Sequence, residues 1–272
     1  MTPRPERRNL PVTSAQSRSP VRFFLLTFVL TVPFLLLGAT TSLQLLPGIP
    51  VSAFAFVCPA MAAAILVYEV SKGAGVQELM KRALDYSRTR AKVWYVPVAL
   101  LMPSISFLTY GMMRLRGMPL RGPQFSPPAA LAMFLAFCLA ALGEELGWSG
   151  YVIDPLQERW GALRASVLLG VVWAVWHYVP LIQVHRSTTW IAWWSLYTVA
   201  LRVLIVWLYN NTGRSVFAAT LFHAFSNVSS VTYSGYYDPR VTGLIVAFVA
   251  TIVVLVWGPR TLVRTKNTQR LS

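Results

Sequence analysis

The sequence predicts an all-α polytopic membrane protein, a helix bundle with about eight transmembrane helices. Its 272 residues are 56% hydrophobic and only 12% charged, and their mean hydropathy is +0.55. A soluble globular domain is about half apolar and about one quarter charged. The chain therefore has the apolar content of a folded protein at half the usual charge, which indicates that lipid is its main solvent.

Eight apolar runs are long enough to cross a bilayer, because a membrane-spanning helix needs roughly 20 mostly apolar residues. The last run, VTGLIVAFVATIVVLVW, carries no charge, and the seventh, SVFAATLFHAFSNVSSVTY, is the most polar. The expected spans lie at 22–46, 51–70, 94–113, 129–148, 163–183, 190–210, 214–234 and 241–257.

The distribution of basic residues predicts how the spans are oriented. If both termini are cytoplasmic, 18 of the 24 Lys and Arg residues fall on the inner side, five on the outer side, and one, Arg202, inside the sixth span. This asymmetry follows the positive-inside rule, and two basic ends on one side require an even number of crossings. We therefore expect a multi-pass integral protein of the cell membrane with both termini in the cytoplasm.

The net charge of +15 would by itself also suit a nucleic-acid-binding protein. However, the basic residues gather at the two ends and in one loop, between long uncharged runs. This pattern marks the cytoplasmic side of a membrane protein. It predicts the lipid bilayer as a partner and excludes nucleic acid.

The chain divides into one transmembrane domain, 22–258, between two basic tails. The tail 1–21 is rich in Pro, Ser and Arg, which is typical of disorder, and the tail 259–272 is expected in the cytoplasm. Residues 71–90 predict an amphipathic helix on the cytoplasmic membrane surface, with side chains such as Leu79 in the lipid and Arg82 at the headgroups.

Ionisable residues inside membrane spans are costly and mark candidate functional sites. The adjacent Glu144 and Glu145 end the fourth span, His177 lies in the fifth, and His223 lies in the seventh. Asn227 follows His223 by four residues, so the two side chains share one helix face.

These residue types together suit the activation of water. Burial in an apolar setting raises the pKa of a glutamate. Its carboxylate can then accept a proton from a water molecule near neutral pH. His177 could hold that water, and His223 and Asn227 could donate hydrogen bonds to an oxyanion. Glu144, His177 and His223 are equally a sufficient ligand set for zinc with an open fourth position. The sequence leaves the metal and metal-free mechanisms open.

Each residue also has a structural interpretation. A histidine inside a membrane helix often hydrogen-bonds a neighbouring helix. Glu144 and Glu145 could form an interfacial charge pair at a helix end. Six tryptophans are expected to be packing residues and interfacial anchors: Trp173, Trp176, Trp190, Trp193, Trp194 and Trp207.

Three motifs resemble the signatures of the CPBP intramembrane proteases, also called the Abi or CAAX prenyl protease 2-like family. GEELGWSGY (143–151), WAVWH (173–177) and HAFSN (223–227) are similar to the family patterns EExxxR, FxxxH and HxxxN. The resemblance implies a core of about eight transmembrane helices and an endopeptidase that cleaves a peptide or protein substrate within or beside the membrane.

The resemblance also implies roles for the matching residues. Glu144 would activate water with help from His177, His223 and Asn227 would form the oxyanion site, and Glu145 would orient the others. The chain departs from the family patterns at two positions: Trp173 stands in place of Phe, and Ser149 in place of Arg.

Ser149 matters because an Arg at that position could pair with Glu145 one turn away. Arg202 is a charge midway along the sixth span and has no obvious partner in the sequence. We therefore predict that Arg202 compensates for the missing Arg by approaching Glu145 or the site around it. The alternative is a catalytically inactive family member that acts as a membrane scaffold or immunity protein.

Overall fold

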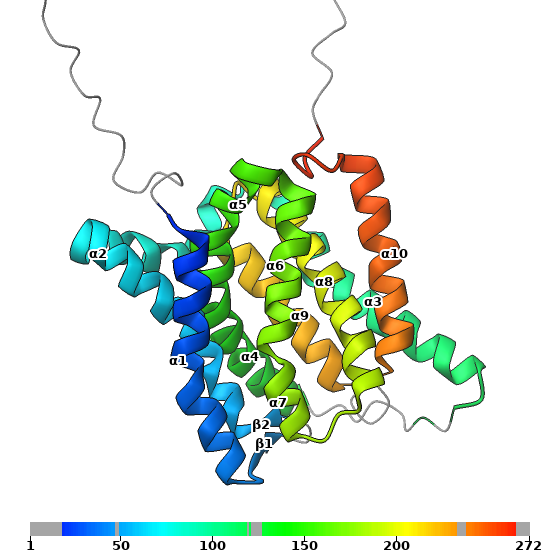
Figure 1. Cartoon of the computed structure of the whole chain (residues 1–272). Helices are drawn as coiled ribbons and strands as arrows, with labels where there is room; N and C mark the ends of the chain where they lie inside the picture. Colours follow the sequence, from blue (N-terminus) through cyan, green and yellow to red (C-terminus); the bar gives the residue numbers. More distant parts are fainter. Residues whose placement is uncertain (1–17, 47–48, 119, 121–126, 233–237, 265–272) are drawn as a thin grey trace, which may run out of the picture.

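The computed structural model describes residues 18–46, 49–118, 120, 127–232 and 238–264. Within them the chain forms a helix bundle with one small β-hairpin (Figure 1). The α-helices are α1 Pro20–Thr40, α2 Cys58–Lys81, α3 Tyr95–Leu115, α4 Pro127–Gly147, α5 Ile153–Trp160, α6 Ala162–Trp176, α7 Tyr178–Gln183, α8 Thr188–Asn211, α9 Val216–Thr232 and α10 Pro239–Trp257.

Shorter elements connect these helices. The antiparallel strands β1 Gln44–Leu46 and β2 Ile49–Pro50 follow α1. A π-helical turn joins α4 to α5, and it spans Trp148–Val152. The 3-10 turns are Val51–Val57, Arg82–Leu84, Tyr86–Arg88 and Lys92–Trp94.

The predicted fold class is confirmed. Among the described residues, seven helices are long and apolar enough to cross a membrane, and the shorter apolar segment Val216–Val231 in α9 is the eighth. The first span is shorter than predicted, because its helix ends at Thr40 and residues 44–46 form β1. The fifth is interrupted at His177, which separates α6 from α7.

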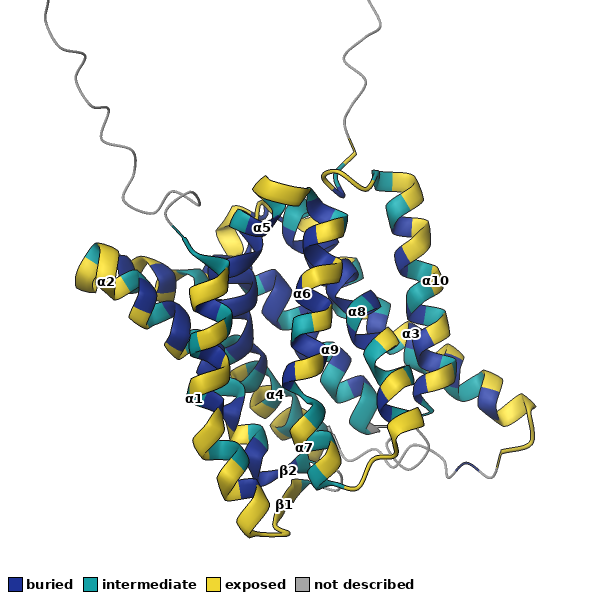
Figure 2. Cartoon of the chain, viewed as in Figure 1, coloured by how far each residue is buried: buried dark blue, intermediate teal, exposed yellow. Residues whose placement is uncertain are grey.

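The outer surface of the bundle is apolar, as expected for a protein in lipid. On α1 the exposed positions include Val21 at 66%, Leu25 at 64% and Val29 at 65% (Figure 2). The buried positions of the same helix include two hydroxyl side chains, Thr27 and Thr31. The helix thus turns large aliphatic side chains outward, which stabilises it only if the surrounding medium is hydrocarbon.

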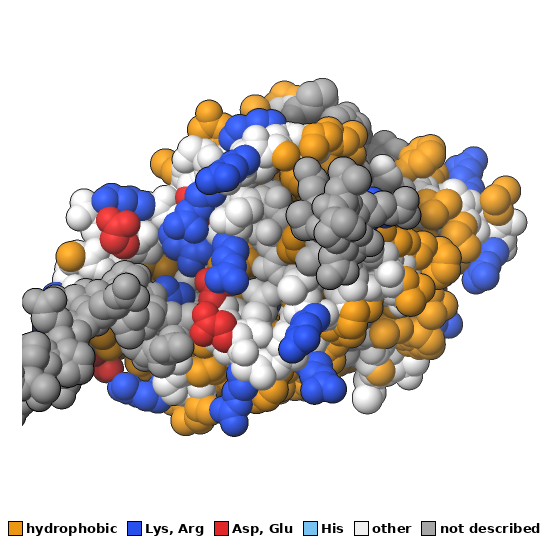
Figure 3. Space-filling view, turned by 90° about the horizontal axis from the view of Figure 1, so that it is seen from above, with side chains coloured by type: hydrophobic (Ala, Val, Ile, Leu, Met, Phe, Trp, Pro, Cys, Tyr) orange, Lys and Arg blue, Asp and Glu red, His pale blue; other side chains and the backbone are white. Residues whose placement is uncertain are grey.

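One end of the bundle carries most of the described basic residues. α1 begins and α10 ends at this end (Figure 1), and Lys and Arg side chains are spread over it with few Asp or Glu among them (Figure 3). This arrangement agrees with an even number of crossings. That this end of the bundle faces the cytoplasm stays a prediction from the positive-inside rule.

Of the helix predicted at 71–90, the part up to Lys81 is helical, and two 3-10 turns follow it. Lys72, with a φ of 52° and a ψ of −153°, is a kink inside α2 that separates this part from the helix before it. Leu79 is buried, and Arg82 turns inward to donate hydrogen bonds to the Gly150 carbonyl at 2.6 Å and the Tyr209 hydroxyl at 2.8 Å. The prediction for Arg82 was wrong because its buried acceptors lie on elements distant in sequence.

The described parts of the two predicted tails belong partly to the bundle. Residues 1–17 and 265–272 lie outside the described residues, and Pro20 and Val21 already belong to α1. Leu262 is fully buried, and the carbonyls of Arg260 and Pro259 accept the Ala162 and Leu163 N–H groups at 2.8 and 2.9 Å. The first residues after α10 therefore cap the start of α6, satisfying donors that a helix N-terminus leaves free.

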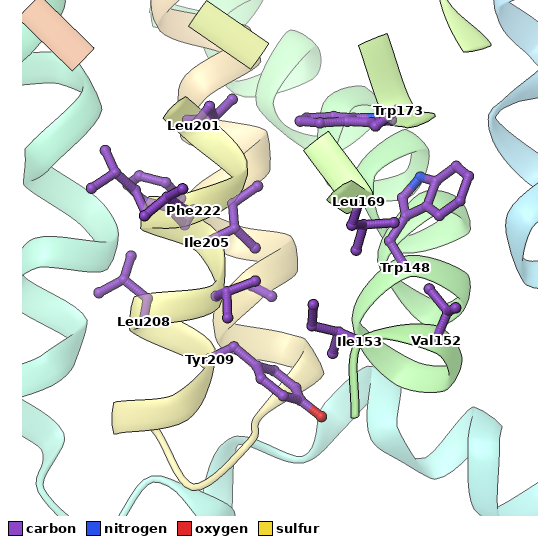
Figure 4. Close-up of a cluster of buried hydrophobic side chains, with 14 of the residues drawn as sticks. Trp148, Val152, Ile153, Leu169, Trp173, Leu201, Ile205, Leu208, Tyr209 and Phe222 are labelled. Carbon is purple, nitrogen blue, oxygen red and sulfur yellow. The ribbon is translucent and has the colours of Figure 1, made fainter. Parts of the chain in front are cut away.

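The core lies where α4, the π-helical turn, α6, α8 and α9 meet (Figure 4). α8 packs against α6 and α10, while α9 packs against α3 and α4. The core side chains are large and apolar and include Trp148, Leu169, Leu204, Ile205 and Phe222. The polar candidate residues of the sequence lie in this same core, so the packing that buries them also fixes their positions.

Gly170 allows α6 and α8 to approach closely. A Cβ atom at Gly170 would lie 2.8 Å from the Cα of Val199 and 3.2 Å from the Cβ of Arg202. A separation of 2.8 Å between two carbons is far below van der Waals contact, and backbone atoms cannot rotate away. The absence of a side chain at Gly170 therefore sets how near Arg202 lies to α6.

We expect Gly170→Ala to destabilise the protein by about 1–3 kcal/mol, because the added methyl group overpacks a helix–helix contact. The matched control is Gly111→Ala in α3, where a Cβ would have nothing within 4 Å. Thermal unfolding in one detergent measures both variants. Equal melting temperatures for the two would show that α6 and α8 have room to separate.

Candidate active site

Glu144 and Glu145 lie in the last turn of α4, directly before the π-helical turn. Their relative exposures are only 6% and 0%. Adjacent residues on a helix point about 100° apart, so the two carboxylates meet different neighbours. π-helical turns of this kind occur often at functional sites.

Arg202 neutralises Glu145, as the sequence predicted. Its Nη1 atom lies 3.0 Å from both carboxylate oxygens of Glu145, and neither side chain is exposed to solvent. Ser149 also donates a hydrogen bond to Oε2 of Glu145. The serine at the family's Arg position therefore serves as a neutral donor, and α8 supplies the positive charge.

The guanidinium of Arg202 also lies over an aromatic ring. Its Cζ atom is 4.1 Å from the ring centroid of Trp173 on α6, a cation–π arrangement. In the described part of the chain, the Nε and Nη2 atoms of Arg202 have no hydrogen-bond acceptor. The Glu145 carboxylate and the Trp173 ring are thus the two groups that offset the burial of this charge.

His223 from α9 is the third partner of Glu145. Its Nδ1 lies 3.1 Å from Oε1 of Glu145, and its side chain is 3% exposed. Because a carboxylate only accepts hydrogen bonds, Nδ1 is the donor and carries a proton. The Nε2 atom then offers a lone pair in the neutral ring and an N–H donor in the imidazolium.

Glu144 has no positively charged partner among the described residues, and its neighbours are indoles. Trp173 donates its Nε1–H to Oε2 of Glu144 at 2.7 Å. Trp148, one turn along the chain, donates to the same oxygen at 3.4 Å. The two adjacent glutamates therefore differ: Glu145 is paired with a cation, whereas Glu144 is held by neutral donors.

His177 lies at the break between α6 and α7. Its backbone N–H bonds to the Ala174 carbonyl, which leaves the Trp173 carbonyl free to accept from the ring Nδ1 at 2.9 Å. In the neutral ring, Nε2 is therefore the acceptor. Its ring meets that of Trp173 edge-on, with centroids 5.7 Å apart.

Asn227 lies one turn beyond His223 on α9 and is half-buried. In the portion of the chain that the structure covers, no hydrogen bond joins its side-chain amide to the Glu144–Glu145 group. The structure therefore brings Glu144, Glu145, His177, His223 and Arg202 into one cluster, and Asn227 lies one turn beyond His223 on the same helix.

The zinc ligand set that the sequence allowed does not converge here. Within the described residues, no group of three His, Cys, Asp or Glu side chains is placed to hold a metal ion. The hydrogen bonds of the three candidates occupy Oε2 of Glu144 and Nδ1 of His177 and His223, but the atoms left free are not grouped to hold an ion.

Two tryptophans were missed as site residues. Trp173 was expected to be a packing residue, and no role was predicted for Trp148, yet both hydrogen-bond Glu144. The four-residue spacing of Glu144 and Trp148 is a weak signal in the sequence, because i and i+4 side chains meet on a helix. The contact of Trp173 joins residues 29 positions apart, and no local pattern predicts it.

Comparisons with known proteins agree with the motifs. The family model described as type II CAAX prenyl endopeptidase Rce1-like matches residues 126–229, which include all three motifs. The protein named CAAX prenyl protease 2 from Methanococcus maripaludis is 27% identical to this chain. The similarity covers 89% of this chain and 95% of that protein.

We expect Arg202→Met to destabilise the protein by about 3–5 kcal/mol, because it leaves the carboxylate of Glu145 buried without a cation. The matched control is Arg22→Met, which breaks the exposed pair of Arg22 and Glu69 and should leave the melting temperature near that of the wild type. Thermal unfolding in detergent compares them.

Adding Ser149→Arg to Arg202→Met should recover part of the lost stability, because an Arg at 149 is one turn from Glu145. Two results would contradict the role of Arg202. One is a melting temperature of Arg202→Met equal to that of Arg22→Met. The other is a double variant no more stable than the single one.

Proposed function

Because this chain belongs to the Rce1-like, type II CAAX prenyl endopeptidase family of membrane proteases (CPBP), we propose that it hydrolyses a peptide bond at the membrane with a water activated by Glu144. The observation that carries this proposal is the unequal pairing of the two glutamates. Arg202 and His223 hold Glu145 as an anion. Glu144 pairs with no cation among the described residues, which leaves it able to accept and return a proton.

In the proposed reaction, a water bound beside Glu144 attacks the carbonyl carbon of the scissile peptide bond. Glu144 takes one proton from this water as the new C–O bond forms, and the carbonyl oxygen becomes an oxyanion. The tetrahedral intermediate then collapses, the C–N bond breaks, and Glu144 returns the proton to the leaving nitrogen. The products are a carboxylic acid and an amine, and the carboxylate of Glu144 is regenerated.

His177 would orient the water, because the neutral ring directs its unprotonated Nε2 away from the Trp173 carbonyl. Its contacts with three indole rings, those of Trp173, Trp176 and Trp194, support one fixed ring position. Ring centroids 4.7 to 5.7 Å apart leave the imidazole little freedom to turn. The water would therefore be held at one distance from Glu144.

His223 and Asn227 would stabilise the oxyanion. Nε2 of His223 would donate from the imidazolium form, whose other ring nitrogen, Nδ1, already donates to the Glu145 carboxylate. Asn227 lies one turn further on the same helix, so its amide would approach the oxyanion from the same side. A single oxyanion donor contributes about 100- to 1000-fold in rate.

The inactive-scaffold alternative loses its main support. It rested on Ser149, which cannot supply the charge of the family's Arg. Arg202 places a guanidinium on Glu145 from α8 instead. The departure from the family pattern is thus compensated inside the same core and does not by itself indicate a lost activity.

The substrate class follows from the family and from the setting of the site. Glu144 lies in the helix α4, within an apolar bundle, so the scissile bond must reach a point inside or beside the bilayer. The similar protein of Methanococcus maripaludis is named for CAAX prenyl substrates. A farnesylated peptide with a C-terminal CAAX sequence is therefore the first substrate to test, with the unprenylated peptide beside it.

We expect Glu144→Gln to lower the rate of peptide cleavage by about 100- to 10,000-fold, because it keeps the size of the side chain and removes the base. Glu158→Gln is the matched control, since Glu158 is exposed on α5. Cleavage of both peptides by purified protein in nanodiscs measures the rates, and comparison of membrane proteomes detects precursors that accumulate in cells. Equal cleavage by wild type and Glu144→Gln would contradict the proposal.

We expect activity to survive dialysis against a chelator, because the Glu144, His177 and His223 side chains do not converge on one point. The measurement is the cleavage rate before and after dialysis, together with metal analysis of the protein. A loss of activity that zinc restores would contradict the metal-free mechanism.

A further inference from the structure

Trp173 lies at the centre of the proposed site, at the position where the family pattern has Phe. Its Nε1–H bonds to Oε2 of Glu144 at 2.7 Å, and Trp148 approaches the same oxygen at 3.4 Å. Figure 4 shows the two indoles, one from α6 and one from the π-helical turn, beside each other in the buried core. A phenylalanine has no N–H group and could not make this hydrogen bond.

The hydrogen bonds make the two oxygens of Glu144 unequal. In the part of the chain that the structure describes, both bonds to this carboxylate end on Oε2 and none ends on Oε1. An indole N–H is a donor only, so it fixes Oε2 without competing for a proton. Oε1 is then the oxygen free to receive the proton of the attacking water.

Trp173 also contacts the other members of the cluster. The Arg202 guanidinium lies over its ring at 4.1 Å, and the His223 ring meets it edge-on with centroids 5.0 Å apart. Its backbone carbonyl accepts the Nδ1–H of His177. One residue therefore links the proposed base to both histidines and to the cation that neutralises Glu145.

We propose that Trp173 is a positioning residue that holds Glu144 by Oε2 and directs Oε1 to the reacting water. This inference rests on the proposed function, because it concerns the base of that reaction. Trp173 touches no reacting atom, so its effect passes through Glu144. The indole N–H is its essential part, and the ring contacts with Arg202 and His223 could be made by any aromatic side chain.

Trp173→Phe keeps an aromatic ring and removes only the N–H donor and part of the ring. A hydrogen bond to a charged group is worth about 1.5–3 kcal/mol, so we expect kcat to fall by about 10- to 100-fold. KM should stay within about twofold, because the lost contact orients the base and does not bind substrate. Trp148→Phe removes the longer bond and should lower kcat less.

The matched control is Trp207→Phe on α8. Trp207 is also buried, its indole N–H has no acceptor within the described residues, and it packs against Trp94 and Trp257 away from the glutamates. This variant tests the loss of an indole as such. We expect its kcat to stay within about twofold of the wild-type value.

A second measurement detects the hydrogen bond without activity. The chain has ten tryptophans, so protein labelled with ¹⁵N-tryptophan gives up to ten indole N–H signals in nanodiscs. Trp173→Phe identifies the Trp173 signal by its loss, and Trp207→Phe identifies that of Trp207. Glu144→Gln removes the charge of the acceptor, so the Trp173 signal should move upfield and the Trp207 signal should not.

A Trp173 signal that moves in Glu144→Gln, with reduced kcat in Trp173→Phe at unchanged KM, supports the proposal. A signal that does not move, or a Trp173→Phe protein as active as the Trp207→Phe control, overturns it. If Trp173→Phe does not fold, a kcat of Trp148→Phe equal to the control also overturns it. Failure of the proposed function looks different, because wild type and Glu144→Gln would then cleave the peptides equally.

Discussion

The buried ion pair between Glu145 and Arg202 is the interaction on which the rest of the site depends. Neither side chain has any exposed surface, so both charges have left water. Each charge alone would cost several kcal/mol in such a medium, and only close geometry with further hydrogen bonds offsets that cost. Arg202 Nη1 bridges both carboxylate oxygens, Ser149 and His223 satisfy the carboxylate further, and the ring of Trp173 faces the guanidinium. These contacts fix α4, α6, α8 and α9 relative to one another.

The backbone around this pair is shaped to hold it. Gly170 brings α6 close to Arg202, and Gly147 brings α4 against the carbonyl of Pro59, where a Cβ atom would lie only 2.5 Å away. Beyond the glutamates, the carbonyl of Gly150 in the π-helical turn accepts hydrogen bonds from Arg18 at 3.1 Å and Arg82 at 2.6 Å. Asp85, close to Arg82 in the chain, accepts the N–H groups of Val216 and Phe217 and so caps α9, the helix of His223. The ends of both site helices are thus tied to one segment at the basic end of the bundle.

Most of the fold could be predicted because the bilayer restricts the choices. Every polar backbone group in hydrocarbon must be hydrogen-bonded within the protein, so long apolar runs become helices and their number follows from hydropathy.

The site was also visible in outline, since polar residues in such runs are costly. Arg202 could be matched to Glu145 because the sequence left one cation without a partner and one carboxylate without its expected Arg. The inward course of Arg82 depends on acceptors far along the chain. The donor roles of Trp148 and Trp173 were hidden for another reason: tryptophan in a membrane span usually packs, and its N–H is a small part of a large apolar side chain.

Two adjacent carboxylates at the end of an apolar helix can acquire different chemistry only if their surroundings differ, since the side chains themselves are identical. The rotation of about 100° between neighbouring helix positions provides this difference. It turns Glu145 toward α8 and α9, where a guanidinium and an imidazole hold it ionised, and Glu144 toward α6, where it meets an indole N–H. A neutral donor orients a carboxylate without neutralising it, and a cation that paired with Glu144 would oppose its taking a proton. Placing Arg202 beside Glu145, with its guanidinium facing the Trp173 ring, keeps the positive charge within the cluster while leaving the proposed base free of it.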